Sequence, residues 1–144
     1  MNPYRRSLLL ALCAPAAAWA DSLSADDRRA VRATIENQLQ ALASGDAALA
    51  FSHASPDIRR QFGDAATFFA MVIQGYPMVI RPAATVFYEP RPIAGAVLQD
   101  LQLRDAAGRN WLATYQLVQL VDQPGRPWRI NGVAVVADSG KSST

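Results

Sequence analysis

The sequence predicts an α+β fold, in which a helical first half packs on an antiparallel sheet formed by the second half. Between residues 25 and 75, apolar residues recur at helical spacing. From residue 85 onward, short apolar runs alternate with turn signals, which is typical of a meander of about four strands. Pro77 and Pro82 interrupt regular structure between the two halves. We expect the sheet to curve around the helices, so that the domain is a cone.

The first twenty residues have the pattern of a Sec-type signal peptide. Arg5 and Arg6 precede an apolar run over residues 7–18, and Ala18-Trp19-Ala20 is the small-x-small cleavage pattern. The run is shorter than the roughly 20 residues that span a bilayer. We therefore expect cleavage after Ala20, a periplasmic or secreted protein, and no membrane segment after cleavage.

The remaining chain is expected to form a single domain over residues 21–137, followed by a disordered polar tail over residues 138–144. Cys13 leaves with the signal peptide, so the domain holds no cysteine. Loss of Arg5 and Arg6 reduces Lys+Arg from 14 to 12, which balances the 12 Asp+Glu. This balance argues against a basic surface for nucleic acid or for membranes.

No metal or cofactor is expected. His53 is the single histidine, so a histidine-based triad or zinc site is excluded, and the absence of cysteine from the domain argues against structural zinc. The sequence contains no phosphate loop and no dinucleotide fingerprint. His53 itself is interpreted either as a lone general base or as a residue near a helix C-terminus.

Capping residues and one apolar stripe predict the helices. Ser24 is the expected N-cap of a long helix. Its buried stripe is formed by Val31, Ile35, Leu39 and Leu42. Three shorter helices follow, with N-caps at Asp46, Ser55 and Asp64. We expect Gly75 to end the last of them in a left-handed conformation, and Pro82 to hold Arg81 extended.

Four strands are predicted in the second half, over Thr85–Glu89, Ala96–Arg104, Trp111–Leu120 and Trp128–Val136. Gly108 and Gly125 supply the turns of two hairpins. Trp111 and Tyr115 lie on one face of the longest strand, and neither face is wholly polar. We expect the long helix to cover one face. The other is covered either by a second subunit or by the last helix or a loop of the same chain.

Several short motifs resemble those of an exported bacterial family known as domain of unknown function 4864. They are Ala54-Ser55-Pro56-Asp57-Ile58, Phe62-Gly63, Met71-Val72-Ile73-Gln74-Gly75-Tyr76-Pro77, Arg81-Pro82, Trp111-Leu112-Ala113-Thr114-Tyr115 and Trp128-Arg129-Ile130-Asn131-Gly132. The resemblance covers residues 25 to 137 and implies the nuclear-transport-factor-2-like, cystatin-like α+β cone. It implies no activity, because that fold carries isomerases, dehydratases, carriers and interaction domains.

Arg81, Tyr76, Tyr115 and Trp111 are the candidate binding residues. Arg81 could take a carboxylate or phosphate in bidentate fashion at the mouth between helices and sheet. The alternative is structural, with Arg81 bound to helix C-terminal carbonyls or paired with Asp57 or Asp64. For a catalytic site, Asp100 or Glu89 would have to face the pocket as a general base of raised pKa. We predict no catalytic residue.

These observations favour a non-enzymatic exported domain that binds a small molecule or a protein. The alternative is a small isomerase- or hydrolase-like enzyme with a pocket carboxylate and tyrosines. A third hypothesis is a structural subunit that forms a homodimer through its sheet, because Trp and Tyr are enriched at interface cores.

Overall fold

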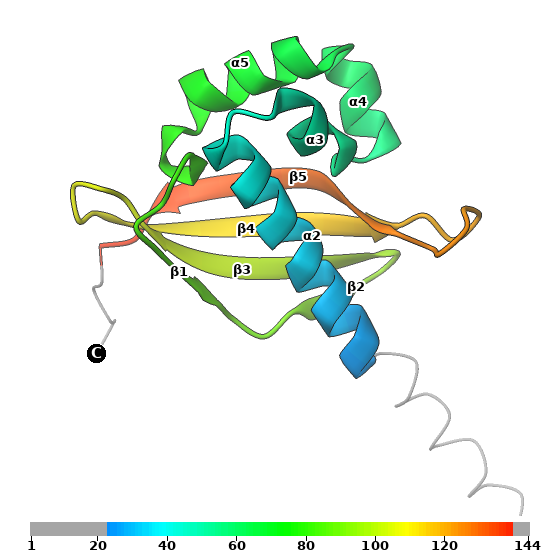
Figure 1. The fold of residues 1–144 in the computed structure, drawn as a ribbon. Helices are drawn as coiled ribbons and strands as arrows, with labels where there is room; N and C mark the ends of the chain where they lie inside the picture. Colours follow the sequence, from blue (N-terminus) through cyan, green and yellow to red (C-terminus); the bar gives the residue numbers. More distant parts are fainter. Residues whose placement is uncertain (1–22, 140–144) are drawn as a thin grey trace, which may run out of the picture.

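The computed structural model describes residues 23–139, which fold as helices followed by an antiparallel sheet (Figure 1). This confirms the predicted α+β class. The helices are α2 (Ala25–Ala43), α3 (Ala47–Ser52), α4 (Pro56–Phe62) and α5 (Ala65–Gly75), followed by the 3-10 turn η2 (Pro77–Val79). The predicted signal peptide and residues 140–144 of the predicted tail lie outside the described residues.

The strands are β1 (Ala84–Phe87), β2 (Arg91–Ile93), β3 (Ala96–Arg104), β4 (Asn110–Gln119) and β5 (Trp128–Ala137). Their order in the sheet is β1-β3-β4-β5, and β2 pairs with the first residues of β3. The sequence predicted about four strands. A fifth forms because Arg91 and Ile93 pair with Leu98 and Ala96, in a proline-containing segment at the edge of the sheet.

Helix N-caps are where the sequence predicted them. Ser24, Asp46, Ser55 and Asp64 each accept a hydrogen bond from the backbone N–H three residues later. The side-chain oxygens satisfy amide groups that have no intrahelical partner, which is why the helices begin at these residues.

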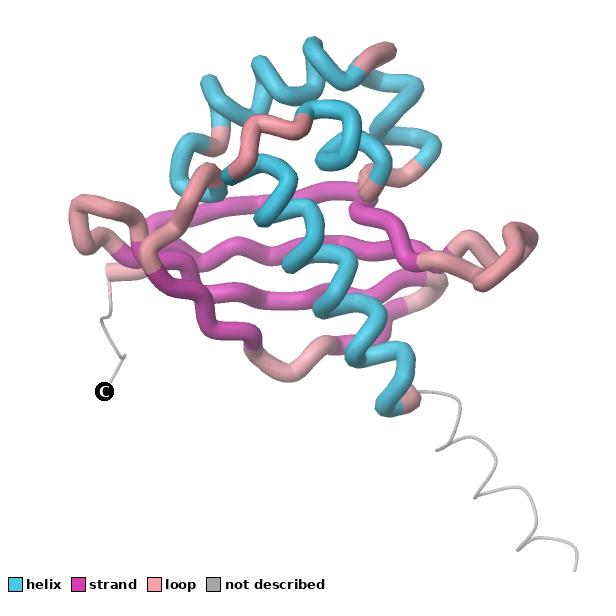
Figure 2. The backbone as a smooth tube through the Cα atoms, in the orientation of Figure 1, coloured by secondary structure: helices cyan, strands magenta, loops and turns pink. Residues whose placement is uncertain are grey.

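All the described helices lie on one face of the sheet (Figure 2). Helix α2 crosses the strands diagonally, while α3, α4 and α5 gather on the side of β5 (Figure 1). The predicted stripe of α2 is buried, with Val31 and Ile35 fully inaccessible. It packs against Leu101 and Leu103 of β3 and Leu117 of β4 in one core. No helix within residues 23–139 is both long and apolar enough to cross a membrane.

The segment between α5 and β1 differs from its predicted conformation. Gly75 is the last residue of α5 and has no positive φ, because Tyr76 takes the C-cap position with φ −135°. Arg81 is left-handed, with φ 54°, although Pro82 was expected to hold it extended. Its Nε donates to the carbonyl of Ala43 at 2.8 Å, so a tertiary hydrogen bond at the end of α2 accompanies this turn.

Candidate functional site

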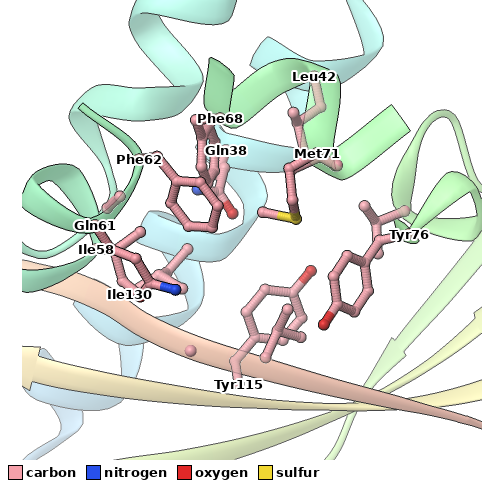
Figure 3. Close-up of a pocket in the computed structure, with 15 residues that line it drawn as sticks. Gln38, Leu42, Ile58, Gln61, Phe62, Phe68, Met71, Tyr76, Tyr115 and Ile130 are labelled. Carbon is pink, nitrogen blue, oxygen red and sulfur yellow. The ribbon is translucent and has the colours of Figure 1, made fainter. Parts of the chain in front are cut away.

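A pocket of about 230 Å³ lies between the helices and the sheet (Figure 3). Its walls are mostly apolar and come from α2, α4, α5, η2, β4 and β5, with Ala54 and Tyr76 from the segments between elements. The main lining residues are Gln38 and Leu42 of α2, Ile58 and Phe62 of α4, Phe68 and Met71 of α5, Tyr76, Tyr115 of β4 and Ile130 of β5. Among residues 23–139, no charged side chain lines this pocket.

Aromatic packing shapes the helical wall. Phe68 contacts Phe62 edge-on, with ring centroids 5.8 Å apart, and Phe51 at 5.5 Å. These three rings join α3, α4 and α5 above the sheet. On the sheet side of the pocket, Gly132 of β5 contributes no side chain.

Tyr115 is the most informative residue of the pocket. Its side chain is only 2% exposed. The hydroxyl points from the sheet toward the helices in Figure 3, and it makes no hydrogen bond with any residue in the range 23–139. Burial raises the pKa of Tyr115 well above its ordinary value, so the group stays a neutral O–H donor.

Three further polar residues line the same space, namely Tyr76, Gln38 and the exposed Gln61 of α4. The ring of Tyr76 enters beside Tyr115 in Figure 3, and within the described part of the chain its hydroxyl has no hydrogen-bond partner. Gln38 is buried and donates its amide N–H to the carbonyl of Ala50 at 3.1 Å. This bond orients the amide, and the Gln38 carbonyl oxygen accepts no hydrogen bond from the described residues.

Gln38 was missed as a site residue, although the sequence contains a signal for it. It lies three residues after Ile35 and four before Leu42, so it interrupts the apolar stripe of α2. A glutamine on a buried helix face needs hydrogen-bond partners, which makes it a candidate for a site.

The predicted binding residues divide between two places. Tyr76 and Tyr115 line the pocket, whereas Arg81 and Trp111 line a separate depression of about 300 Å³ beside the β3–β4 hairpin. There Trp111 donates its Nε1–H to Asp105 at 3.0 Å. That bond is the largest cause of the lowered pKa of Asp105, ahead of the bond from the Arg109 amide.

The structural alternative for Arg81 agrees with its observed contact, a hydrogen bond to the C-terminal carbonyl of α2. Asp57 and Asp64 are occupied elsewhere, since Asp57 pairs with Arg60 and Asp64 caps α5. An ion pair of Arg81 with either carboxylate is therefore absent.

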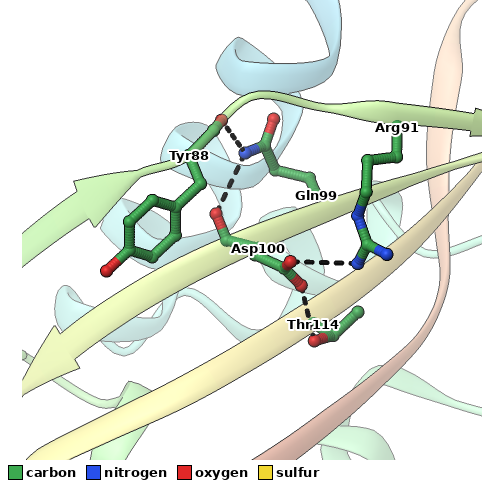
Figure 4. A network of polar contacts seen from close by, with 5 residues as sticks. All are labelled: Tyr88, Arg91, Gln99, Asp100 and Thr114. Atoms are coloured by element: carbon green, nitrogen blue, oxygen red, sulfur yellow. Dashed lines mark hydrogen bonds and ion pairs between the residues drawn. The ribbon is translucent and has the colours of Figure 1, made fainter. Parts of the chain in front are cut away.

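Asp100 and Glu89 do not reach the pocket. Asp100 accepts from Arg91 at 2.9 Å and from the Thr114 hydroxyl at 2.6 Å (Figure 4). Glu89 forms an ion pair with Arg28 on the surface. Neither carboxylate can act as the pocket base that the enzyme hypothesis required.

The sheet face that carries Asp100 has no helical cover among the described residues (Figure 2). Large apolar side chains stand exposed on its strands and edge, namely Val86, Tyr88, Ile93 and Val136. Of the covers considered for this face, the last helix is excluded, because α5 lies on the opposite face (Figure 1).

Comparison with known proteins gives a family but no described relative. No curated protein and no solved structure matches the chain. A family model described as a domain of unknown function, DUF4864, matches residues 24–143, which include every helix and strand described above. The chain therefore belongs to the DUF4864 family of domains of unknown function.

Proposed function

We propose that this protein is a non-enzymatic module that binds a small, uncharged and largely apolar molecule between its helices and sheet. The observation that carries the proposal is the Tyr115 hydroxyl, which belongs to a side chain only 2% exposed, has no hydrogen-bond partner among the described residues and is directed into an apolar pocket. A hydrogen bond to such a donor is worth about 1 kcal/mol. A ligand that brings an acceptor gains this energy on binding.

The chemistry of the walls describes the ligand. Tyr115 and Tyr76 offer two O–H donors, and Gln38 offers one carbonyl acceptor. A ligand with a carbonyl or hydroxyl group satisfies these atoms, while its apolar part contacts Leu42, Phe68 and similar side chains. An ionised ligand is disfavoured, because the pocket offers no opposite charge to a buried ion.

The volume limits the size of the ligand. A cavity of about 150 Å³ holds benzene. The pocket of about 230 Å³ therefore suits a compound of one or two rings, or a short branched chain. Typical sites for drug-sized molecules are larger, from about 300 Å³ upward.

Calorimetry with three probes of one shape tests the proposal. 2-Naphthol, naphthalene and 2-naphthoate differ in the polar group alone. We expect 2-naphthol to bind best and to lose about fivefold in affinity in Tyr115→Phe, since one hydrogen bond is worth about 1 kcal/mol. Naphthalene should bind both proteins equally, and naphthoate should bind most weakly.

Tyr88→Phe is the matched control, because Tyr88 is exposed and outside the pocket. It should leave all three affinities unchanged. Equal affinity of 2-naphthol for Tyr115→Phe and the unsubstituted protein would refute the hydrogen-bonding role. Failure of both naphthol and naphthalene to bind would refute the pocket.

The proposed place of action is the periplasm or the exterior of a bacterial cell. The signal-like pattern of Arg5, Arg6 and Ala18-Trp19-Ala20 supports this. The order of helices before a meander, with a pocket between the two layers, also supports membership of the nuclear-transport-factor-2-like superfamily. N-terminal sequencing of the protein from an expressing bacterium tests export, with Asp21 as the expected first residue.

A further inference from the structure

The depression of about 300 Å³ between the η2 turn and the β3–β4 hairpin is a second candidate site. We call it the hairpin depression, and its main lining residues are Met78, Ile80, Arg81, Asp105, Arg109 and Trp111. Within residues 23–139, no residue lines both this depression and the apolar pocket around Tyr115. A ligand of the hairpin depression is therefore recognised by different side chains.

Asp105 is the only carboxylate among the described residues that line the hairpin depression, and its acceptor positions are filled. Its Oδ1 accepts the backbone N–H of Ala107 at 3.0 Å and that of Arg109 at 2.9 Å. Its Oδ2 accepts the Nε–H of Arg109 at 3.1 Å and the indole N–H of Trp111 at 3.0 Å. A carboxylate has about four such positions. Asp105 and Arg109 thus offset each other's charge within the hairpin.

Arg81 is fixed at one side of its guanidinium and free at the other. Its Nε donates to the carbonyl of Ala43 at 2.8 Å. Its two Nη groups form no hydrogen bond and no ion pair with any residue in the range 23–139. The backbone is left-handed, with φ 54°, and such costly conformations cluster at ligand-binding sites. The uncompensated charge of the hairpin depression is therefore that of Arg81.

The remaining wall of the hairpin depression suits an apolar group. Trp111 is half-buried, its N–H is held by Asp105, and the guanidinium of Arg109 lies 5.7 Å from its ring centroid. Met78 and Ile80 line the same depression and are also half-buried. An indole held in this way offers a large apolar contact at little cost in side-chain entropy.

We propose that the hairpin depression binds a small monocarboxylate, with its carboxylate held by Arg81 and its apolar group packed on Trp111. Because Nε is occupied, Nη1 and Nη2 remain, and their N–H groups match the two oxygens of a carboxylate. One uncompensated cation matches one negative charge, which favours a carboxylate over a phosphate dianion. The site goes beyond the function proposed above, because it selects a charge that the apolar pocket disfavours.

The indole N–H signal of Trp111 in NMR spectra reports occupancy of the hairpin depression. The indole of Trp128, which is bonded to Asp27 outside the depression, is an internal control. The probes are 3-phenylpropionate, its neutral amide and acetate, at constant ionic strength. We expect phenylpropionate to shift the Trp111 signal in a saturable way without moving that of Trp128. The amide lacks the charge and acetate lacks the ring, so each should bind at least fivefold more weakly.

Variants assign the charge selection to Arg81. Arg81→Gln should weaken 3-phenylpropionate to the affinity of the amide and leave the amide unchanged. Arg126→Gln is the matched control, because Arg126 is also exposed and left-handed, with φ 45°, but does not line the depression. It should leave all three dissociation constants unchanged.

Three results would overturn the proposal. They are the absence of a saturable shift at Trp111, equal affinity for the acid and the amide, and undiminished affinity for the acid in Arg81→Gln. The comparison of acid and amide uses the unsubstituted protein, so it decides the matter even if Arg81→Gln does not fold. A failure of the naphthol experiment leaves this test untouched, since the two sites share no lining residue.

Discussion

Trp128, at the start of β5, donates its indole Nε1–H to the carboxylate of Asp27 in the first turn of α2, at 3.4 Å. The two residues are 101 positions apart in the sequence. The Thr34 hydroxyl also lies 3.5 Å from the carbonyl of Trp128. The beginning of the long helix is thus fastened to the last strand, and the core closes around this contact.

Trp128→Ala should lower the free energy of unfolding by about 3–5 kcal/mol, because the side chain is 8% exposed and belongs to the core. Trp128→Phe should cost less, since it keeps most of the apolar area and loses the bond to Asp27. Urea denaturation followed by circular dichroism measures both. A loss below about 1 kcal/mol in Trp128→Ala would contradict its place in the core.

Arg81→Ala should lower the free energy of unfolding by about 1 kcal/mol, because it removes the hydrogen bond to Ala43. Arg81→Gly removes the same hydrogen bond. It also removes the strain of the left-handed conformation at position 81, because that conformation costs a residue with a side chain roughly 1–2 kcal/mol. The glycine variant should therefore be the more stable of the two in urea denaturation. The reverse order would refute the strain at this position.

Stability should fall as the pH drops below about 6.5, the ordinary pKa of histidine. Burial, and then the charge of Arg129, hold the pKa of His53 below that value in the folded state. As the pH falls, His53 therefore takes up its proton in the unfolded chain first. The free energy of unfolding decreases until the pH passes the pKa of His53 in the folded state. Above pH 6.5 the residue is neutral in both states and contributes no slope.

Urea denaturation between pH 7.5 and 5 measures this slope. His53→Gln should flatten it, and Arg129→Gln should reduce it. His53 shares a surface depression of about 450 Å³ with the charged groups Asp26, Asp27, Arg126 and Arg129. An unchanged slope in His53→Gln would assign the pH dependence to another group.

A homodimer through the open sheet face stays a prediction. Val136 is 58% exposed on this face, and Val121 is similarly exposed in the turn after β4. Val136→Lys should convert a dimer to a monomer in sedimentation at micromolar concentration, whereas Val121→Lys should not. Monomeric unsubstituted protein would contradict the dimer.

Local signals in the sequence were sufficient for most of the fold. Ser24, Asp46, Ser55 and Asp64 act as N-caps because capping depends on a few neighbouring residues. The period-2 pattern of Ala96–Arg104 predicted β3 to the residue. Arg81 shows the limit of such reasoning, since its conformation accompanies a contact with Ala43, 38 residues away.

The candidate site was only half predictable for a similar reason. Trp111 and Tyr115 share a face of β4, as the alternation of side chains between the two faces of a strand predicted. They are four positions apart along the strand, however, and at about 3.3 Å per residue this is roughly 13 Å. Trp111 therefore lies at the hairpin end, and Tyr115 lies under the helices. The distance between the two places depends on the packing of α4 and α5, which no local pattern specifies.

An isolated bridge between Ala54 and Ile130 has a consequence for how this sheet can grow. It occupies backbone groups of β5 that would otherwise be open to a strand from another molecule. The opposite edge consists of two short strands, and Pro92 in β2 has no N–H to offer. Addition of strands, the usual route to β-aggregates, is therefore disfavoured along β2 and at the beginning of β5, where the bridge occupies both backbone groups of Ile130.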